Sequence, residues 1–261
     1  AGGLGGAGGL GFSMPEIEVF GIKGKGEKVF IILDSSPEMM YDEMGGIAAY
    51  TIIKNELVKI IEGLPGTALF NVAVYDSGRT YMLFPKLVSA NSSNVSKAES
   101  WLKPLNAVRP GMGANDWGGS TLGPGGMECR DDFLIGKFER QELWYRPSML
   151  AMKQQADAVF ILTSWWGHQR IVKGDRDTDW HNGSAGRRWN ESYEKAKLML
   201  DEENKKRVAN GQPPRVIRRD NAWDMNHAYF PDIERPPEPE FYYHKPNEFV
   251  EGFIQVREQY K

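Results

Sequence analysis

The stretch "KVFIILDSSPE", residues 28–38, decides the fold of this chain. Residues 29–33 are all apolar, and most of them are β-branched or aromatic. Such a run is typical of a strand that is buried on both faces, and strands of this kind form parallel sheets that helices cover. The strand is expected to end at Asp34, so that an acid and the hydroxyls of Ser35 and Ser36 leave the sheet together.

The rest of the chain alternates between the two periodicities. After Pro37, which suits the first turn of a helix, apolar residues recur at spacings of three and four up to Leu64, and Gly63 and Pro65 end the expected helix. Further strands are expected at 68–76, 80–88, 157–164, 213–219 and 241–244, and the first two of these form a hairpin. Further helices are expected at 92–105, 191–211 and 245–260, and in parts of 127–155, where the helix is broken near Pro147. This order predicts an α/β, Rossmann-like, doubly wound fold with a mostly parallel central sheet flanked by helices.

The composition divides the chain into two parts. Residues 1–27 are expected to form a glycine-rich linker and lead-in, and residues 28–261 a single domain with insertions at about 109–156, 165–190 and 218–239. The formal net charge of −3 argues against nucleic acid as a partner, and the single cysteine, Cys129, excludes an internal disulfide. No apolar run approaches the ~20 residues of a membrane span.

Polar side chains follow three of the predicted strands. Asp34, Asp76 and Ser164 each lie at or just after a strand's carboxyl end. Ligands of doubly wound sheets bind at this edge, so these side chains are expected to lie close together.

Three short motifs now indicate a family. "FIILDSSPE", 30–38, resembles the strand and DxSxS loop of von Willebrand factor type A (vWA) domains. "GGST", 118–121, resembles their Gly-Gly-Thr loop, and "VFILTS", 159–164, resembles the strand that usually ends in Thr-Asp-Gly. The element order is similar over residues 28–261, and the lead-in at 19–34 resembles vWA proteins of planctomycete-like bacteria.

The resemblance implies a metal-ion-dependent adhesion site, in which oxygen ligands hold Mg²⁺. Asp34 matches the first Asp and Ser36 the first Ser, whereas Glu38 stands in place of the second Ser and Ser164 in place of the third-loop Asp. The candidate metal ligands are Asp34, Ser36, Glu38, Ser120, Thr121 and Ser164. One interpretation is that Glu38 compensates for the missing acid and Mg²⁺ binds. The other, which we favour, is a metal-free site in which Asp34 and Ser36 satisfy nearby N–H groups and no cofactor is needed.

The resemblance also implies a function. We expect a non-enzymatic protein–protein interaction or adhesion module, displayed from an upstream anchor at the bacterial cell envelope or periplasm, with the cytoplasm as the alternative. A second hypothesis is a structural subunit of a larger envelope assembly, with residues 1–13 packed between copies. A third is a hydrolase, either metal-assisted on Asp34 and Glu38 or built from a serine and a histidine; its candidate groups are Ser35, Ser36, Ser164, His168, His181, His227 and His244.

Aromatic and basic residues gather after the last buried strand. Tryptophan and arginine are the residues that most often anchor protein interfaces, so this region is the candidate contact with a protein partner. An alternative is that the tryptophans pack the insertion onto the domain. The residues concerned are Trp165, Trp166, Trp180, Trp189, Trp223, Arg170, Arg176, Arg187 and Arg188.

Overall fold

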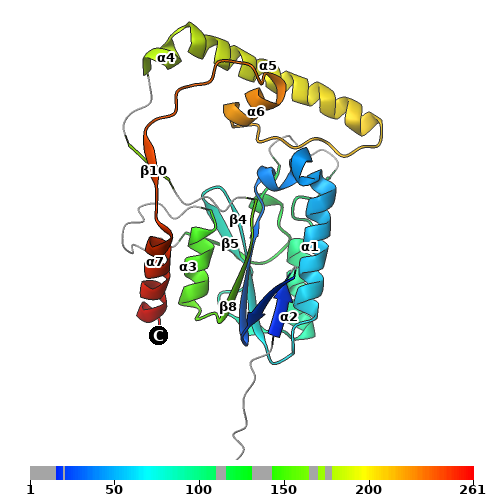
Figure 1. The fold of residues 1–261 in the computed structure, drawn as a ribbon. Coiled ribbons are helices and arrows are strands. Elements are labelled where there is room, and N and C mark those ends of the chain that lie inside the picture. Colours follow the sequence, from blue (N-terminus) through cyan, green and yellow to red (C-terminus); the bar gives the residue numbers. More distant parts are fainter. Residues whose placement is uncertain (1–15, 20, 110–115, 131–142, 165–169, 174–177) are drawn as a thin grey trace, which may run out of the picture.

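The computed structural model describes residues 16–19, 21–109, 116–130, 143–164, 170–173 and 178–261 (Figure 1). The strands are β1 Glu16–Val19, β2 Ile22–Lys25, β3 Lys28–Asp34, β4 Leu69–Asp76, β5 Arg79–Met82, β6 Val88–Ser89, β7 Met127–Cys129, β8 Ala158–Leu162, β9 Arg170–Val172 and β10 Phe241–Tyr243. The helices are α1 Gly46–Glu62, α2 Ser92–Leu102, α3 Tyr145–Lys153, α4 Thr178–Asn182, α5 Ser184–Ala209, α6 Ala222–Tyr229 and α7 Pro246–Gln259. The prediction that residues 1–13 pack between copies falls outside the described residues.

The central sheet is parallel at its centre and antiparallel at one side. Its strand order is β7-β5-β4-β3-β8, and β6 also pairs with β4. β3 runs parallel to both β4 and β8, whereas β5 and β6 are antiparallel to β4, and β7 to β5. The expected α/β class is confirmed, with a central sheet that is compatible with a Rossmann-like fold.

Burial of β3 on both faces explains the layers. Val29, Ile31 and Leu33 belong to a core shared with α1 and α2, and Phe30 and Ile32 to a second core shared with α3 and α7. All five side chains are fully buried. Each such burial stabilises the fold by roughly 1.5–3 kcal/mol. The helices therefore cover the two faces of the sheet, as Figure 1 shows.

The helix that was expected to begin after Pro37 begins later. Pro37 instead opens a 3₁₀ turn, Pro37–Met40, and a second one follows at Asp42–Met44. Gly45 and Gly46 then adopt positive φ angles of 89° and 67°, which side chains other than glycine rarely adopt. This change of direction starts α1 at Gly46 and leaves residues 37–44 free to form the rim of the sheet's carboxyl edge.

Two predictions next to this sheet need correction. The hairpin of β4 and β5 is confirmed, but the strand expected at 80–88 ends at Met82 and resumes only at Val88, because Pro85 has no N–H for the ladder. Within 127–155, which is expected to be helical in parts, Tyr145–Lys153 form α3 and Met127–Cys129 form β7. Pro147 does not break a helix, since it lies in the first turn of α3.

Residues 178–229 form a helical cap above the carboxyl edge of the sheet. The sequence predicts a loop or insertion at 165–190, but α4 and the first turns of α5 occupy 178–190. α5 and α6 share a small core of their own, made by Ala196, Leu200, Ile217 and Met225. Figure 1 shows α5 crossing over the end of the sheet, with α6 beneath it.

Two other predicted strands do not join the central sheet. Residues 213–219 pair with no strand of the described chain. Val216 packs in the core of α1 and α2, and Ile217 in the core of the cap, so this segment is held by its side chains and not by a ladder. β10 is a strand, as expected, but its partner is β9, in a separate ribbon.

A buried lysine ties α1 to the end of α2. Lys54 is 4% exposed, and its Nζ donates to the carbonyl oxygens of Lys103, at 3.0 Å, and Leu105. Burial lowers the pKa of this amine from 10.5 to about 8. Between these two values the unfolded chain binds more protons than the folded one, so the contribution of Lys54 to stability rises with pH.

We expect Lys54→Met to lower the free energy of unfolding by about 1–3 kcal/mol, because two buried carbonyls lose their donor. The difference in the free energy of unfolding between parent and variant should widen from pH 8 to 10.5, because only the parent carries the amine whose pKa is lowered by burial. Urea denaturation across this range measures both effects. Lys97→Met, at an exposed site on α2, is the control and should be neutral. A difference that narrows with rising pH would contradict the assignment.

Candidate functional site

Asp34 is the centre of the strand-end cluster. Its side chain is 3% exposed. Oδ1 accepts hydrogen bonds from the backbone N–H of Ser36 at 2.9 Å and from its hydroxyl at 2.5 Å. Oδ2 accepts from the hydroxyl of Ser164 at 3.1 Å and from its N–H at 3.4 Å. The structure therefore brings Asp34, Ser36 and Ser164 together, as the topology predicted.

A hydroxyl relay completes the shell of Asp34. Tyr75, at the end of β4, donates its hydroxyl to Thr163 Oγ1 at 2.7 Å, and Thr163 Oγ1 lies 3.3 Å from Asp34 Oδ2. Burial, followed by the nearby Asp34 carboxylate, raises the pKa of Tyr75 far above its ordinary value. Tyr75 therefore remains protonated and donates. Sequence reasoning missed Thr163, although it stands next to Ser164.

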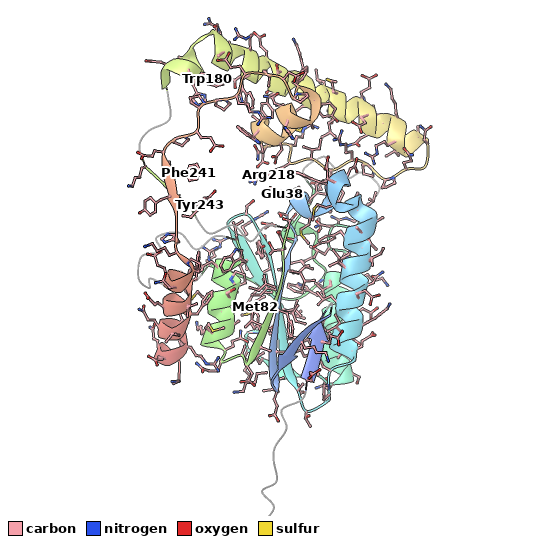
Figure 2. All side chains as sticks on the ribbon, viewed as in Figure 1. Glu38, Met82, Trp180, Arg218, Phe241 and Tyr243 are labelled. Carbon is pink, nitrogen blue, oxygen red and sulfur yellow. The ribbon has the colours of Figure 1, made fainter. Side chains whose placement is uncertain are left out.

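Glu38 pairs with a cation of the cap. Its Oε1 lies 3.1 Å from Arg218 Nη1, and Arg218 Nη2 donates to Ser77 Oγ at 3.3 Å. Figure 2 shows Glu38 and Arg218 close together where the cap meets the sheet. Glu38 Oε2 is buried and has no hydrogen-bond partner within the described residues. Glu38 lies in the first turn of the 3₁₀ helix Pro37–Met40, whose N-cap residue is Ser36, and its carboxylate pairs with Arg218.

The loop that carries the GGST motif, residues 118–121, lies beside Asp76. The N–H of Gly119 donates to Asp76 Oδ2, and Asp76 also pairs with Arg79 at 2.9 Å. A side chain at Gly118 would overlap Asp76, and a side chain at Gly119 would overlap Tyr81. Only glycine therefore permits this close approach. The expected convergence of Asp76 with the Asp34 cluster is therefore replaced by a pairing of its own.

The two hydroxyls of this loop have different surroundings. Thr121 is buried, accepts from the N–H of Asn106 at 2.8 Å and donates to the carbonyl of Gly118 at 2.7 Å. Ser120 is exposed, and its hydroxyl lies 3.4 Å from the carbonyl oxygen of Trp117. Asn106 links the loop to the Asp34 strand through a bond from Nδ2 to the carbonyl of Ser35 at 3.0 Å.

The candidate metal ligands thus lie in three separate settings. Asp34, Ser36 and Ser164 bind one another, Glu38 binds Arg218, and the hydroxyls of residues 120 and 121 bind backbone carbonyls. Among the described residues, no group of three or more His, Cys, Asp or Glu side chains is placed to hold an ion. This arrangement does not fit the octahedral oxygen shell of Mg²⁺ without rearrangement.

The cap closes over this edge and leaves a cavity of about 650 Å³. Tyr41 donates to Asp224 of α6 at 2.7 Å and accepts from the N–H of Arg218 at 3.1 Å. Arg207 of α5 pairs with Asp42 at 2.8 Å. Lining side chains from the sheet edge and its rim are Asp34, Ser36, Glu38, Tyr41 and Tyr75, and those from the cap are Arg218, Asp224, His227 and Ala228.

The tryptophans of the cap pack against one another. Trp189 is 6% exposed, and its ring lies 6.4 Å from that of Trp180 and 6.2 Å from that of Trp223. The guanidinium of Arg235 stands 5.1 Å from the Trp223 ring. Packing of the insertion therefore accounts for Trp189, whereas Arg187 and Arg188 are exposed. Trp165, Trp166, His168, Arg176 and the side chain of Arg170 lie outside the described residues.

Among the described residues, no hydrogen bond joins a histidine to a serine. His227 lines the cavity but makes no hydrogen bond to a serine hydroxyl in the described chain. His244 is buried and lies 2.9 Å from Glu248, and His181 packs edge-on against Trp180. Ser35 donates its hydroxyl to the carbonyl of Tyr75 at 2.9 Å, which places it in the backbone framework.

Comparison of the chain with protein-family models, with curated proteins and with solved structures found no match. No helix of the described residues has both the length and the apolar character that a bilayer crossing requires.

We expect Asp34→Asn to lower the free energy of unfolding by about 1–3 kcal/mol. The N–H groups of the new amide would face N–H and O–H donors whose hydrogen bonds the carboxylate accepts. Urea denaturation measures the change. Asp232→Asn, at an exposed position in the 230–240 connector, is the matched control and should leave stability unchanged. If Asp34→Asn is as stable as the parent, the hydroxyls of Ser36 and Ser164 do not hold this carboxylate.

Proposed function

We propose that this chain is a non-enzymatic protein-interaction module of the vWA type, which binds its partner at the carboxyl edge of the sheet and the adjoining cap. The observation that carries the proposal is the meeting of Asp34, Ser36 and Ser164 at the ends of β3 and β8. These are the positions at which the vWA motifs of the first and third loops were recognised. Their convergence supports the family resemblance.

The state of these groups favours binding over catalysis. A serine nucleophile needs a base within hydrogen-bond reach, and a general base needs an available lone pair. Ser36 and Ser164 instead donate their hydroxyls to Asp34, whose two oxygens are already occupied by protein donors. His227 is the described histidine that lines the same cavity, and it makes no hydrogen bond to either serine.

The cap changes how a partner would reach this edge. In the proposed module, the strand ends form the floor of a cavity, and α6 forms part of its wall. A partner would therefore contact the rim and insert a group into the cavity. Display from an upstream anchor at the bacterial cell envelope or periplasm remains part of the proposal, and the glycine-rich composition of residues 1–13 supports it.

Site-specific photo-crosslinking in cells that produce the protein natively tests this proposal. A benzophenone amino acid at position 227, exposed on α6 and on the cavity wall, should give one discrete adduct with another protein. The same group at position 97, exposed on α2 at a distance from the cavity, is the control and should not give that adduct. Absence of an adduct at 227, or the same adducts at both positions, would show that this edge does not bind a protein.

A further inference from the structure

We infer that the cavity under the cap binds an organic cation, an ammonium group carried on an apolar body. The inference rests on the proposed function, because it names the chemistry of the group that the same site accepts. A free amine and the lysine side chain of a protein partner share this chemistry.

The size and the walls of the cavity point to an organic ligand. Its volume of about 650 Å³ lies within the ~300–1,000 Å³ of small-molecule sites. Apolar walls come from both layers: Met44 from the rim, Ile217 and Ala228 from the cap, and Leu143 from the segment before α3. A bare metal ion would gain nothing from such walls, whereas a ligand with an apolar body would bury surface against them.

The formal charges that line the cavity favour a cation. Four carboxylates face two guanidinium groups, which leaves two net negative charges; the residues are Asp34, Glu38, Glu43, Asp224, Arg215 and Arg218. The guanidinium groups are already paired, Arg218 with Glu38 and Arg215 with Asp42 and Glu203. An anionic ligand would have to break one of these pairs and approach the remaining carboxylates, so a cation is the favoured occupant.

Among these carboxylates, Glu38 has an oxygen that is buried without a hydrogen bond from the described residues. Both oxygens of Asp34 accept bonds from protein donors, and Asp224 Oδ2 accepts from Tyr41 and Asn221. Glu38 Oε1 binds Arg218, but Glu38 Oε2 is buried without a partner among the described residues. A buried acceptor left unpaired is destabilising, and the cost is larger for a charged group. Rotation of the Glu38 carboxyl towards the cavity would let a ligand ammonium supply the missing donor.

Aromatic surface at the same place would add to the attraction. Tyr41 and Tyr75 both line the cavity. Cations are attracted to the faces of aromatic rings, and the effect grows when water is excluded. The pair of Arg218 with Glu38 already shows that a cation is stable beside this carboxylate.

Calorimetric titration with three ligands of nearly equal size tests the inference. Phenethylamine is the cation, 2-phenylethanol its neutral analogue and phenylacetate the anion. We expect phenethylamine to bind about tenfold more tightly than 2-phenylethanol, because one charge-assisted hydrogen bond contributes a difference of this size. We expect phenylacetate to bind most weakly. Nα-acetyl-lysine methylamide identifies the source: tighter binding than phenethylamine assigns the cation to a protein side chain, and weaker binding assigns it to a free amine.

Three variants locate the site. Glu38→Gln should weaken phenethylamine binding about tenfold more than it weakens 2-phenylethanol binding, because only the amine loses a charged partner. His227→Trp should block both ligands, because residue 227 is exposed on α6 and a larger ring there would fill the cavity. Lys206→Trp, on the exposed side of α5 and outside the cavity, is the control and should change neither. Circular dichroism and thermal unfolding would confirm that each variant is folded.

Several results would overturn the inference: no binding of phenethylamine, equal binding of the three ligands, or tightest binding of phenylacetate. Binding that survives His227→Trp would also overturn it, since the amine would then lie elsewhere. None of these results bears on the adduct at position 227, so failure of the cation inference can be told apart from failure of the proposed function.

Discussion

Burial of β3 on both faces is the constraint on which the rest of this structure depends. The five side chains from Val29 to Leu33 are fully removed from solvent, and a strand of this kind is stable only between two helical layers. The same strand ends at an acid, Asp34, which is also buried. A buried carboxylate needs hydrogen-bond donors, and the ends of β3 and β8 supply them through Ser36 and Ser164. The packing of the sheet and the polar cluster at its edge therefore have one origin.

The cap turns this edge into the wall of a cavity. It is attached by several polar contacts, those of Tyr41 with Asp224, Arg218 with Glu38 and Arg207 with Asp42. Exposed ion pairs are individually worth only about 0.2–1 kcal/mol. The segment that enters α6 adds apolar attachment, because Val216 packs in the core of the sheet and Ile217 in the core of the cap. Two neighbouring side chains thus join the two cores.

The strand-end residues are held by contacts within the protein. Asp34 and the hydroxyls near it bind one another, and Arg218 brings a positive charge to Glu38. The ring cluster of Trp180, Trp189 and Trp223 supports the cap that carries this arginine. In this account, the tryptophans act on the site by holding the cap in place.

Local patterns predicted the sheet well and the cap poorly. The apolar runs of β3 and β4 correspond to nearly complete burial, whereas β8 reaches such burial only at Phe160. The rule for the carboxyl ends of strands correctly placed Asp34 and Ser164 together. The polar character of residues 178–190 concealed a helix, because its packing is provided by Trp189 and by partners far along the chain. The segment 213–219 contains the consecutive β-branched residues Val216 and Ile217, which favour a strand, yet these two side chains pack in two different cores. The pairing of Glu38 with Arg218 spans 180 residues, and no spacing rule could have indicated it.

The claim that the cap is held over the sheet edge can be tested by a distance measurement. Spin labels would be placed at positions 97 on α2 and 202 on α5, both exposed, in a Cys129→Ser background. Pulsed electron paramagnetic resonance then measures the distance between the two labels. The account predicts one narrow distance distribution, which broadens when Arg218→Gln removes the pair with Glu38. A broad or multiple distribution in the parent chain would contradict it.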